Sequence, residues 1–249
     1  MANINGTSGQ NDFLNGTEQN DLIQGLAGND TILGLMGDDL IYGSNDPNPP
    51  PNALDNDSIL GNQGSDTIIG NQGDDIIFSG QGIRDIVYGG QGNDIIYGDR
   101  GRDFLRGDLG NDTIIAGNFP GPPGTEREVL VGGQGKDSLF GGSGPDVLSG
   151  DFGKDTLTGG AGRDTFVLRT RTAVTNVAEA DIVTDYRVGE DVIQVYANRG
   201  SLALNVQGNT TVISIAGTNQ ILGVLNGQFS FGQLTIGYGS PNSDFNPGF

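Results

Sequence analysis

The chain contains no cysteine, no histidine and no tryptophan, and only 12 of its 249 residues are lysine or arginine. Without cysteine it forms no disulfide, and without cysteine and histidine it lacks the ligands that zinc and copper prefer. It also carries no HExxH motif, no Gly-x-Ser-x-Gly elbow and no thiol nucleophile. These absences predict that the protein is not an enzyme.

Positive charge and long apolar runs are also scarce. The 31 acidic residues give a formal charge of −19, which disfavours nucleic acid as a partner because nucleic-acid binding needs a basic surface. No apolar stretch reaches the length of a membrane-spanning helix. Residues 1–20 are polar, so we expect no cleavable N-terminal signal peptide.

Glycine and aspartate are abundant and periodic. Aspartate recurs every nine residues along most of the chain, inside the frame Gly-Gly-x-Gly-x-Asp-x-apolar-x. The frame is clearest at residues 89–97 and 132–140. A fixed short period of this kind predicts a repeat architecture in which each unit stacks on its neighbours.

The apolar position of the frame predicts a short strand in every repeat. A single inward side chain between two outward neighbours has the two-residue period of a strand, and the glycines allow the tight turns between strands. Two repeats then form one 18-residue coil of an all-β solenoid with two parallel sheets. The predicted core residues are Leu14, Ile23, Ile32, Ile41, Ile59, Ile68, Ile77, Val87, Ile96, Leu105, Ile114, Leu130, Leu139, Leu148, Leu157 and Phe166.

Three departures interrupt the period. Residues 43–56 replace one repeat, one extra residue precedes Asp85, and residues 118–127 are followed by Glu128 at the aspartate position. We expect the two long departures, near 43–56 and 118–127, to be loop insertions, because surface loops tolerate added length. We also expect the first to leave the phase of the coils unchanged. One sheet would then carry an outward, mainly apolar column of Gln24, Tyr42, Leu60, Phe78, Tyr97, Ile115, Phe140 and Thr158.

Stacked coils place each aspartate beside the one 18 residues further on. A row of carboxylates repels itself unless a cation lies between neighbouring turns. Oxygen ligands in a flexible arrangement suit calcium, whereas magnesium dehydrates reluctantly. The predicted metal ligands are Asp21, Asp30, Asp39, Asp57, Asp66, Asp75, Asp85, Asp94, Asp103, Asp112, Asp137, Asp146, Asp155 and Asp164.

Over roughly residues 5–168 the chain resembles the RTX, or haemolysin-type, calcium-binding repeat family. The resemblance implies a right-handed parallel β-roll that binds on the order of ten Ca²⁺ ions between its turns. It also implies a secreted, extracellular protein, exported by a type I secretion machinery that reads an uncleaved C-terminal signal. Such a chain would fold only when it meets calcium outside the cell.

The periodicity stops after Asp164, which predicts two domains: a β-roll at 1–168 and a C-terminal β cap with the secretion signal at 169–249. Residues 181–195 have the pattern strand, turn, strand, and residues 209–225 that of a hairpin. Both resemble the β-structured segment that follows the roll in secreted RTX proteins. A cap is needed because the last apolar layer would otherwise be exposed.

The sequence is compatible with two functions. The first is a structural one, a calcium-folded surface or matrix protein without enzymatic activity. The second is a polysaccharide-binding module, acting alone or beside a separate enzyme, because Tyr42, Phe78 and Tyr97 of the outward column offer flat faces to sugar rings. The same column is also a candidate surface for self-association.

Overall fold

The computed structural model describes residues 1–46, 55–117, 126–196 and 202–238, and the chain divides into two compact units, residues 1–119 and 120–249. The described residues form strands and three short 3₁₀ helices. None of these helices is long and apolar enough to cross a membrane.

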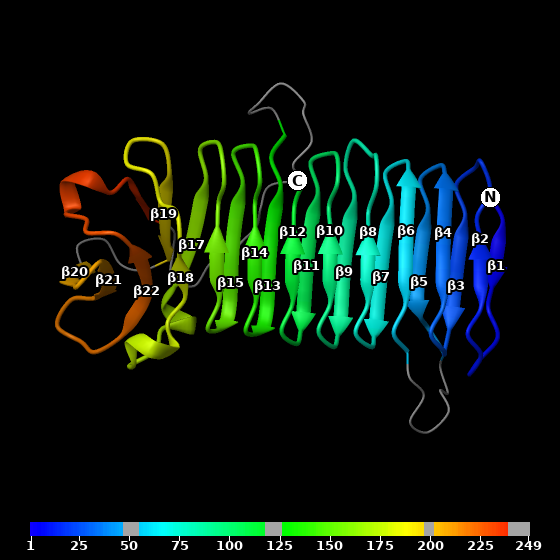
Figure 1. Cartoon of the computed structure of the whole chain (residues 1–249), viewed down its shortest axis with the longest axis horizontal. Helices are drawn as coiled ribbons and strands as arrows, with labels where there is room; N and C mark the ends of the chain where they lie inside the picture. The colour runs from blue at the N-terminus through cyan, green and yellow to red at the C-terminus, as the bar shows by residue number, and fades with distance from the viewer. Residues whose placement is uncertain (47–54, 118–125, 197–201, 239–249) are drawn as a thin grey trace. The chain divides into compact units, whose positions relative to one another are not determined.

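The first unit is a stack of parallel strands in two sheets, as the nine-residue period predicts (Figure 1). Successive strands alternate between the sheets, so that β1, β3, β5, β7, β9 and β11 form one sheet and the even-numbered strands form the other. The strands are β1 (Asn3–Asn5), β2 (Phe13–Asn15), β3 (Leu22–Leu26), β4 (Thr31–Met36), β5 (Leu40–Ser44), β6 (Ser58–Gln63), β7 (Thr67–Gln72), β8 (Ile76–Phe78), β9 (Ile86–Gln91), β10 (Ile95–Tyr97), β11 (Phe104–Leu109) and β12 (Thr113–Ile115).

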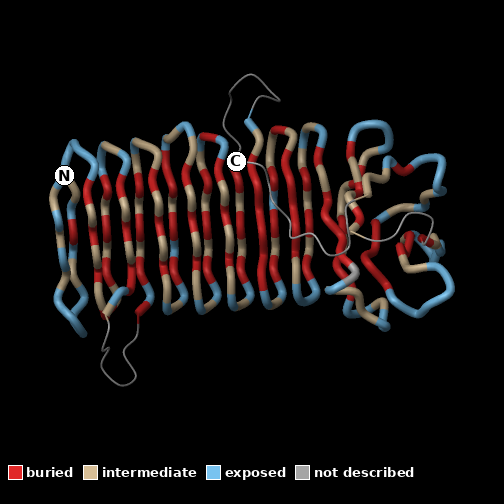
Figure 2. Tube along the Cα trace, turned by 180° about the vertical axis from the view of Figure 1, so that it is seen from behind, coloured by how far each residue is buried: buried red, intermediate tan, exposed pale blue. Residues whose placement is uncertain are grey.

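The core is formed by the apolar eighth position of the frame. Every residue predicted there is buried, and all except Leu14 are fully inaccessible to solvent. Buried residues follow the strand centres, and the exposed ones gather at the bends (Figure 2). Each fully buried aliphatic side chain stabilises the fold by about 1.5–3 kcal/mol.

The first insertion shifts the phase of the coils, and the prediction that the phase survives is wrong. β4 pairs in parallel with β6, with Thr31 opposite Ser58. Asp30 therefore lies one coil before Asp57, at a sequence separation of 27 instead of 18. The reason is that the added residues lengthen one connection between consecutive strands and do not build a half-coil. Residues 47–54 of this insertion, with its run of prolines, lie outside the described residues.

The shift also divides the predicted outward column between two sheets. Gln24 pairs with Tyr42, and Tyr42 with Ile69, in the odd-numbered sheet. In the even-numbered sheet, Leu60 pairs with Phe78, and Phe78 with Tyr97. The outward apolar surface of this sheet therefore runs through Leu33, Leu60, Phe78, Tyr97 and Ile115.

The extra residue before Asp85 has only a local effect. Ile83 is 84% exposed, and Asp66 still donates its backbone N–H to Asp85 across a separation of 19 residues. The turn therefore bulges outward while the strands on both sides stay in register.

The second unit contains further parallel coils followed by an antiparallel segment. One sheet has the order β13-β15-β17-β19-β23 and the other β14-β16-β18-β22-β21-β20. The elements are β13 (Val129–Gly135), β14 (Ser138–Phe140), β15 (Val147–Gly153), β16 (Thr156–Thr158), β17 (Thr165–Arg169), η1 (Thr170–Thr172), η2 (Val177–Glu179), β18 (Ile182–Val183), β19 (Val192–Tyr196), β20 (Leu202–Gln207), β21 (Thr210–Ile215), β22 (Ile221–Asn226), η3 (Phe231–Gln233) and β23 (Ile236–Tyr238).

Parallel pairing continues past residue 168. β18 pairs with β16, and β19 pairs with β17, with Phe166 opposite Ile193. The predicted hairpin at 209–225 is confirmed, because β21 and β22 are antiparallel. The division into a roll at 1–168 and a cap at 169–249 stays a prediction, and residues 197–201 and 239–249 of that cap lie outside the described residues.

Candidate metal-binding edges

The frame aspartates form hydrogen-bonded ladders along the edges of the coils. One carboxylate oxygen, Oδ1, accepts the backbone N–H of the acidic residue one coil earlier, at 2.7–2.9 Å in the first unit. The two ladders of this unit are Asp12, Asp30, Asp57, Asp75, Asp94, Asp112 and Asp21, Asp39, Asp66, Asp85, Asp103.

The second unit repeats this arrangement with two ladders, at 2.9–3.1 Å. They run Glu128, Asp146, Asp164, Asp191 and Asp137, Asp155, Asp181. All the aspartates that the sequence predicts as ligands therefore lie on a ladder.

Glycine is required around each ladder because the turns approach one another closely. A Cβ at Gly89, the first glycine of its frame, would overlap Asp94 Oδ2. Gly92, the third glycine, has a φ of 127° and lies against the carbonyl of Gly73 in the previous coil. The frame thus packs carboxylate and carbonyl oxygens together at each edge.

The second carboxylate oxygen, Oδ2, distinguishes the interior coils. Among the described residues, Oδ2 is buried and has no hydrogen-bond partner in Asp30, Asp39, Asp57, Asp66, Asp75 and Asp94. A buried carboxylate oxygen that lacks a partner is costly, and a row of them indicates a missing counter-charge.

Burial dominates the electrostatics of these carboxylates. It raises the pKa of Asp57 to about 8 and of Asp75 to about 9, against the backbone hydrogen bonds that lower both, and neighbouring aspartates raise them further. Burial also raises the pKa of Asp66 and Asp94 to about 7. The metal-free fold therefore disfavours charged carboxylates, and a cation at the edges would reverse this preference.

The N-terminal end of the first unit departs from this pattern. The Thr17 N–H and hydroxyl both donate to Asp21 Oδ2, each at 2.7 Å, and the Ala2 N–H donates to Asp21 Oδ1. The Ala2 hydrogen bond is the largest cause of the lowered pKa of Asp21. This carboxylate is satisfied by neutral donors of the chain itself.

The donor set of the interior edges fits calcium. The available ligands are carboxylate and carbonyl oxygens in a flexible, repeated arrangement, which is the chemistry that calcium prefers. Among the residues that the structure describes, no three acidic side chains converge on one point. Any ion would therefore draw its ligands from adjacent turns, including backbone carbonyls.

Four ladder members were not among the predicted ligands: Asp12, Glu128, Asp181 and Asp191. Glu128 replaces aspartate and still donates its N–H to Asp146 Oδ1 at 3.0 Å. Asp181 and Asp191 extend the ladders beyond Asp155 and Asp164. The sequence signal for these two was present, since each aspartate is followed two residues later by a fully buried aliphatic, Val183 or Ile193. The frame glycines are absent before Asp181, and only the third, Gly189, remains before Asp191.

Comparison with known proteins points to one family. A model of the RTX calcium-binding nonapeptide repeat matches the chain in four copies, at residues 6–46, 54–84, 83–114 and 131–166. No curated protein sequence matches the chain.

Among solved structures, the chain is similar to the extracellular lipase LipA from Serratia marcescens. The two share 18% sequence identity with a TM-score of 0.34, and the alignment covers 88% of this chain and 38% of the lipase. The chain thus spans well under half of the lipase's length.

Proposed function

Because the chain belongs to the RTX calcium-binding nonapeptide repeat family, we propose that it is a secreted protein that folds by binding about ten calcium ions between its stacked turns. The ligands are the predicted ladder aspartates of the interior coils, Asp30 to Asp155, together with turn carbonyls. The observation that carries the proposal is the row of buried Oδ2 atoms without hydrogen-bond partners in the interior coils.

Calcium supplies the counter-charge that these edges lack. It neutralises carboxylates that would otherwise repel one another and joins turns that are distant in the sequence. Because the unfolded chain has no preformed site, the binding free energy becomes folding free energy. With a formal charge of −19 and 34% hydrophobic residues, the metal-free chain has the composition of a disordered polyelectrolyte.

Dependence on calcium is consistent with export. A chain that stays unfolded at low cytosolic calcium can pass through a type I secretion channel and then fold outside, where extracellular modules bind calcium at about 10⁻⁴–10⁻³ M. The secretion signal lies near the C-terminus. The folded product has a structural role at the cell surface or in a matrix and carries no enzymatic activity.

Far-UV circular dichroism during a calcium titration from a chelated start tests the proposal, with magnesium as the control. We expect a cooperative transition from coil to β structure in calcium alone, with a midpoint in or just below the millimolar range. A chain that is fully β-structured in chelator would refute calcium-driven folding and remove the physical basis for export before folding.

A second candidate function is polysaccharide binding through the even-numbered sheet. Phe78 and Tyr97 stack with their ring centroids 4.6 Å apart and their planes 5° from parallel. A groove of about 480 Å³ is lined by Phe78, Leu35, Met36 and Leu60, among others. Aromatic faces beside a groove are suited to sugar rings.

Measuring glycan binding by the Tyr97→Ala variant distinguishes the two proposed functions. The matched control is Tyr88→Ala, since Tyr88 occupies the same frame position on the odd-numbered sheet. Loss of glycan retention in Tyr97→Ala alone, with calcium-dependent folding intact, would support the module. Absence of retention of wild type on every acidic and neutral glycan would exclude it.

A further inference from the structure

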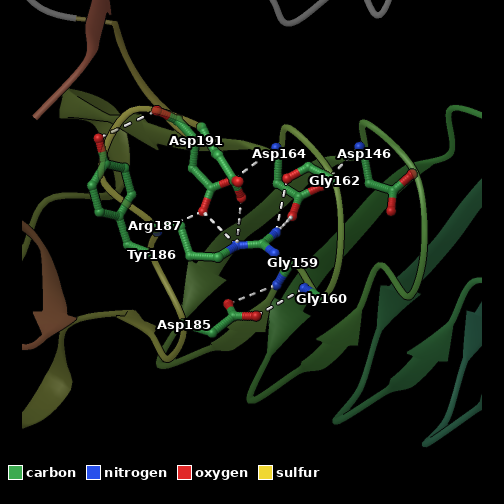
Figure 3. Close-up of polar contacts among 10 residues, drawn as sticks. Asp146, Gly159, Gly160, Gly162, Asp164, Asp185, Tyr186, Arg187 and Asp191 are labelled. Carbon is green, nitrogen blue, oxygen red and sulfur yellow. Dashed lines mark hydrogen bonds and ion pairs between the residues drawn. The ribbon is translucent and has the colours of Figure 1, made fainter. Parts of the chain in front are cut away.

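The last ladder turn of the second unit contains a cation of the chain itself. Arg187, in the connection between β18 and β19, extends its guanidinium toward the turn that ends in Asp164 (Figure 3). Its Nη2 donates to the carbonyl of Gly162 at 2.8 Å and lies 3.4 Å from Asp164 Oδ2. Gly162 is the third glycine of its frame, and Asp164 is the frame aspartate.

The same two kinds of oxygen line the edges of the interior coils. In the interior, Oδ2 of residues such as Asp75 and Asp94 is buried without a partner. The carbonyl of a third glycine there lies against the glycine of the next coil, as Gly73 does against Gly92. At the last turn the guanidinium contacts both kinds of oxygen instead.

The other atoms close to the guanidinium are carboxylate oxygens. Its Nε lies 3.3 Å from Glu190 Oε2 and 3.8 Å from Asp191 Oδ2. The backbone N–H of Arg187 donates to the same Asp191 oxygen at 2.7 Å. The guanidinium nitrogens thus lie 2.8–3.8 Å from oxygen atoms of Gly162, Asp164, Glu190 and Asp191.

The segment around Arg187 is fixed on both sides. The Asp185 carboxylate accepts the N–H groups of Gly159 and Gly160 at 2.9 and 2.8 Å, from the same turn that Arg187 contacts (Figure 3). The Tyr186 hydroxyl donates to the Asp191 carbonyl at 3.2 Å. These contacts hold the guanidinium over Gly162 and Asp164.

We infer that Arg187 occupies the last cation position of its ladder in place of calcium. The inference rests on the proposed function, because it assumes that the interior positions take calcium ions. A guanidinium 3.4 Å from Asp164 Oδ2 repels a divalent ion from that oxygen, so the last turn closes without calcium. Removing the guanidinium would leave Asp164 Oδ2 and the Gly162 carbonyl without a cation and so create a calcium position at the last turn.

The test compares the number of calcium ions bound by wild type, Arg187→Met and Arg163→Met, all full-length and measured by native mass spectrometry at saturating calcium. Arg163 is exposed and immediately precedes Asp164, so its replacement removes the same charge close by without opening the site. We expect one additional ion per chain in Arg187→Met and an unchanged number in Arg163→Met. An equal count in wild type and folded Arg187→Met would overturn the inference.

A folding defect in Arg187→Met is also informative. If an ion can replace the guanidinium, the thermal midpoint of the variant falls below that of wild type at limiting calcium and recovers in excess calcium. A variant that stays unfolded at every calcium concentration would contradict the inference, since calcium would then not substitute for the guanidinium. Wild type that binds no calcium would refute the proposed function itself, which is a separate result.

Discussion

The interior coils and the antiparallel segment β20–β22 bury their residues in different ways. Interior repeats such as those of Asp66, Asp75 and Asp94 bury one aliphatic side chain and one aspartate. The antiparallel segment instead packs Val212, Ile221 and Val224 together with Ala180 from outside the segment, in an ordinary hydrophobic cluster. The repeats therefore combine a thin apolar core with a row of buried charge, whereas the segment needs no counter-ion.

The difference shows how one chain can combine ion-dependent and ion-independent structure. A carboxylate buried every nine residues opposes folding until a cation arrives, since desolvation disfavours the charged form. Between the glycine-rich repeats and the antiparallel segment, Arg187 supplies a positive charge to the Asp164 carboxylate. Ladder geometry therefore continues to Asp191, although the glycine frame has ended.

Removal of calcium should give the largest contrast. In chelator we expect the amides of the interior strands, such as β9 to β11, to lose protection against hydrogen exchange, because their buried carboxylates lack a counter-charge. The amides of β20–β22 should retain protection. Hydrogen-exchange mass spectrometry of the full chain with and without calcium measures both regions, and equal loss in both would contradict the comparison.

Truncation of a core side chain should have the next largest effect. Ile77→Ala removes a fully buried aliphatic side chain and should lower the free energy of unfolding in calcium by about 2–5 kcal/mol. Its neighbour Ile76 is 42% exposed, so Ile76→Ala should change stability by about 0.5 kcal/mol or less. Denaturant titration of both variants tests whether the thin core contributes to the free energy of unfolding in addition to calcium. Similar losses of this free energy in the two variants would argue against such a contribution.

Acidification should partly replace calcium in the repeats. Burial raises the pKa of Asp57 to about 8 and of Asp75 to about 9, above the ordinary value of 3.8. The metal-free fold then holds protons that the unfolded chain releases, so its stability falls as the pH rises from 3.8 toward 9. In chelator, the β signal in circular dichroism should increase when the pH is lowered from about 8 to about 5. A decrease would show that the buried carboxylates do not control folding.

Loss of one ladder carboxylate should have the smallest effect. Asp94 accepts the N–H of Asp75 and donates its own N–H to Asp112, so Asp94→Ala should weaken two neighbouring calcium sites. The matched control is Asp74→Asn, because Asp74 hydrogen-bonds with Asn56 and Asn93 on an exposed edge, where an amide fits. Calcium stoichiometry and midpoint measure the effect, and values unchanged from wild type in Asp94→Ala would rule out sharing.

The nine-residue period by itself determined the repeats, the core residues and the carboxylates of the edges. These follow from local chemistry, because every copy of the frame places one aliphatic side chain in the core and one aspartate at the edge of a coil. The sequence also contained the Asp-x-aliphatic signal at Asp181 and Asp191, but the glycine pair that opens the frame is absent before both.

Only the tertiary structure decided which coils are neighbours. The first insertion places Asp30 beside Asp57, and no local signal distinguishes a lengthened connection from a replaced half-coil. The structure also decided that Arg187 contacts Asp164, because a cation 23 residues away reaches that carboxylate only through the path of β18 and β19. The nine-residue spacing determines which side chains each repeat places in the core and at the edge. The path of the chain in three dimensions determines which residues of other coils contact those side chains.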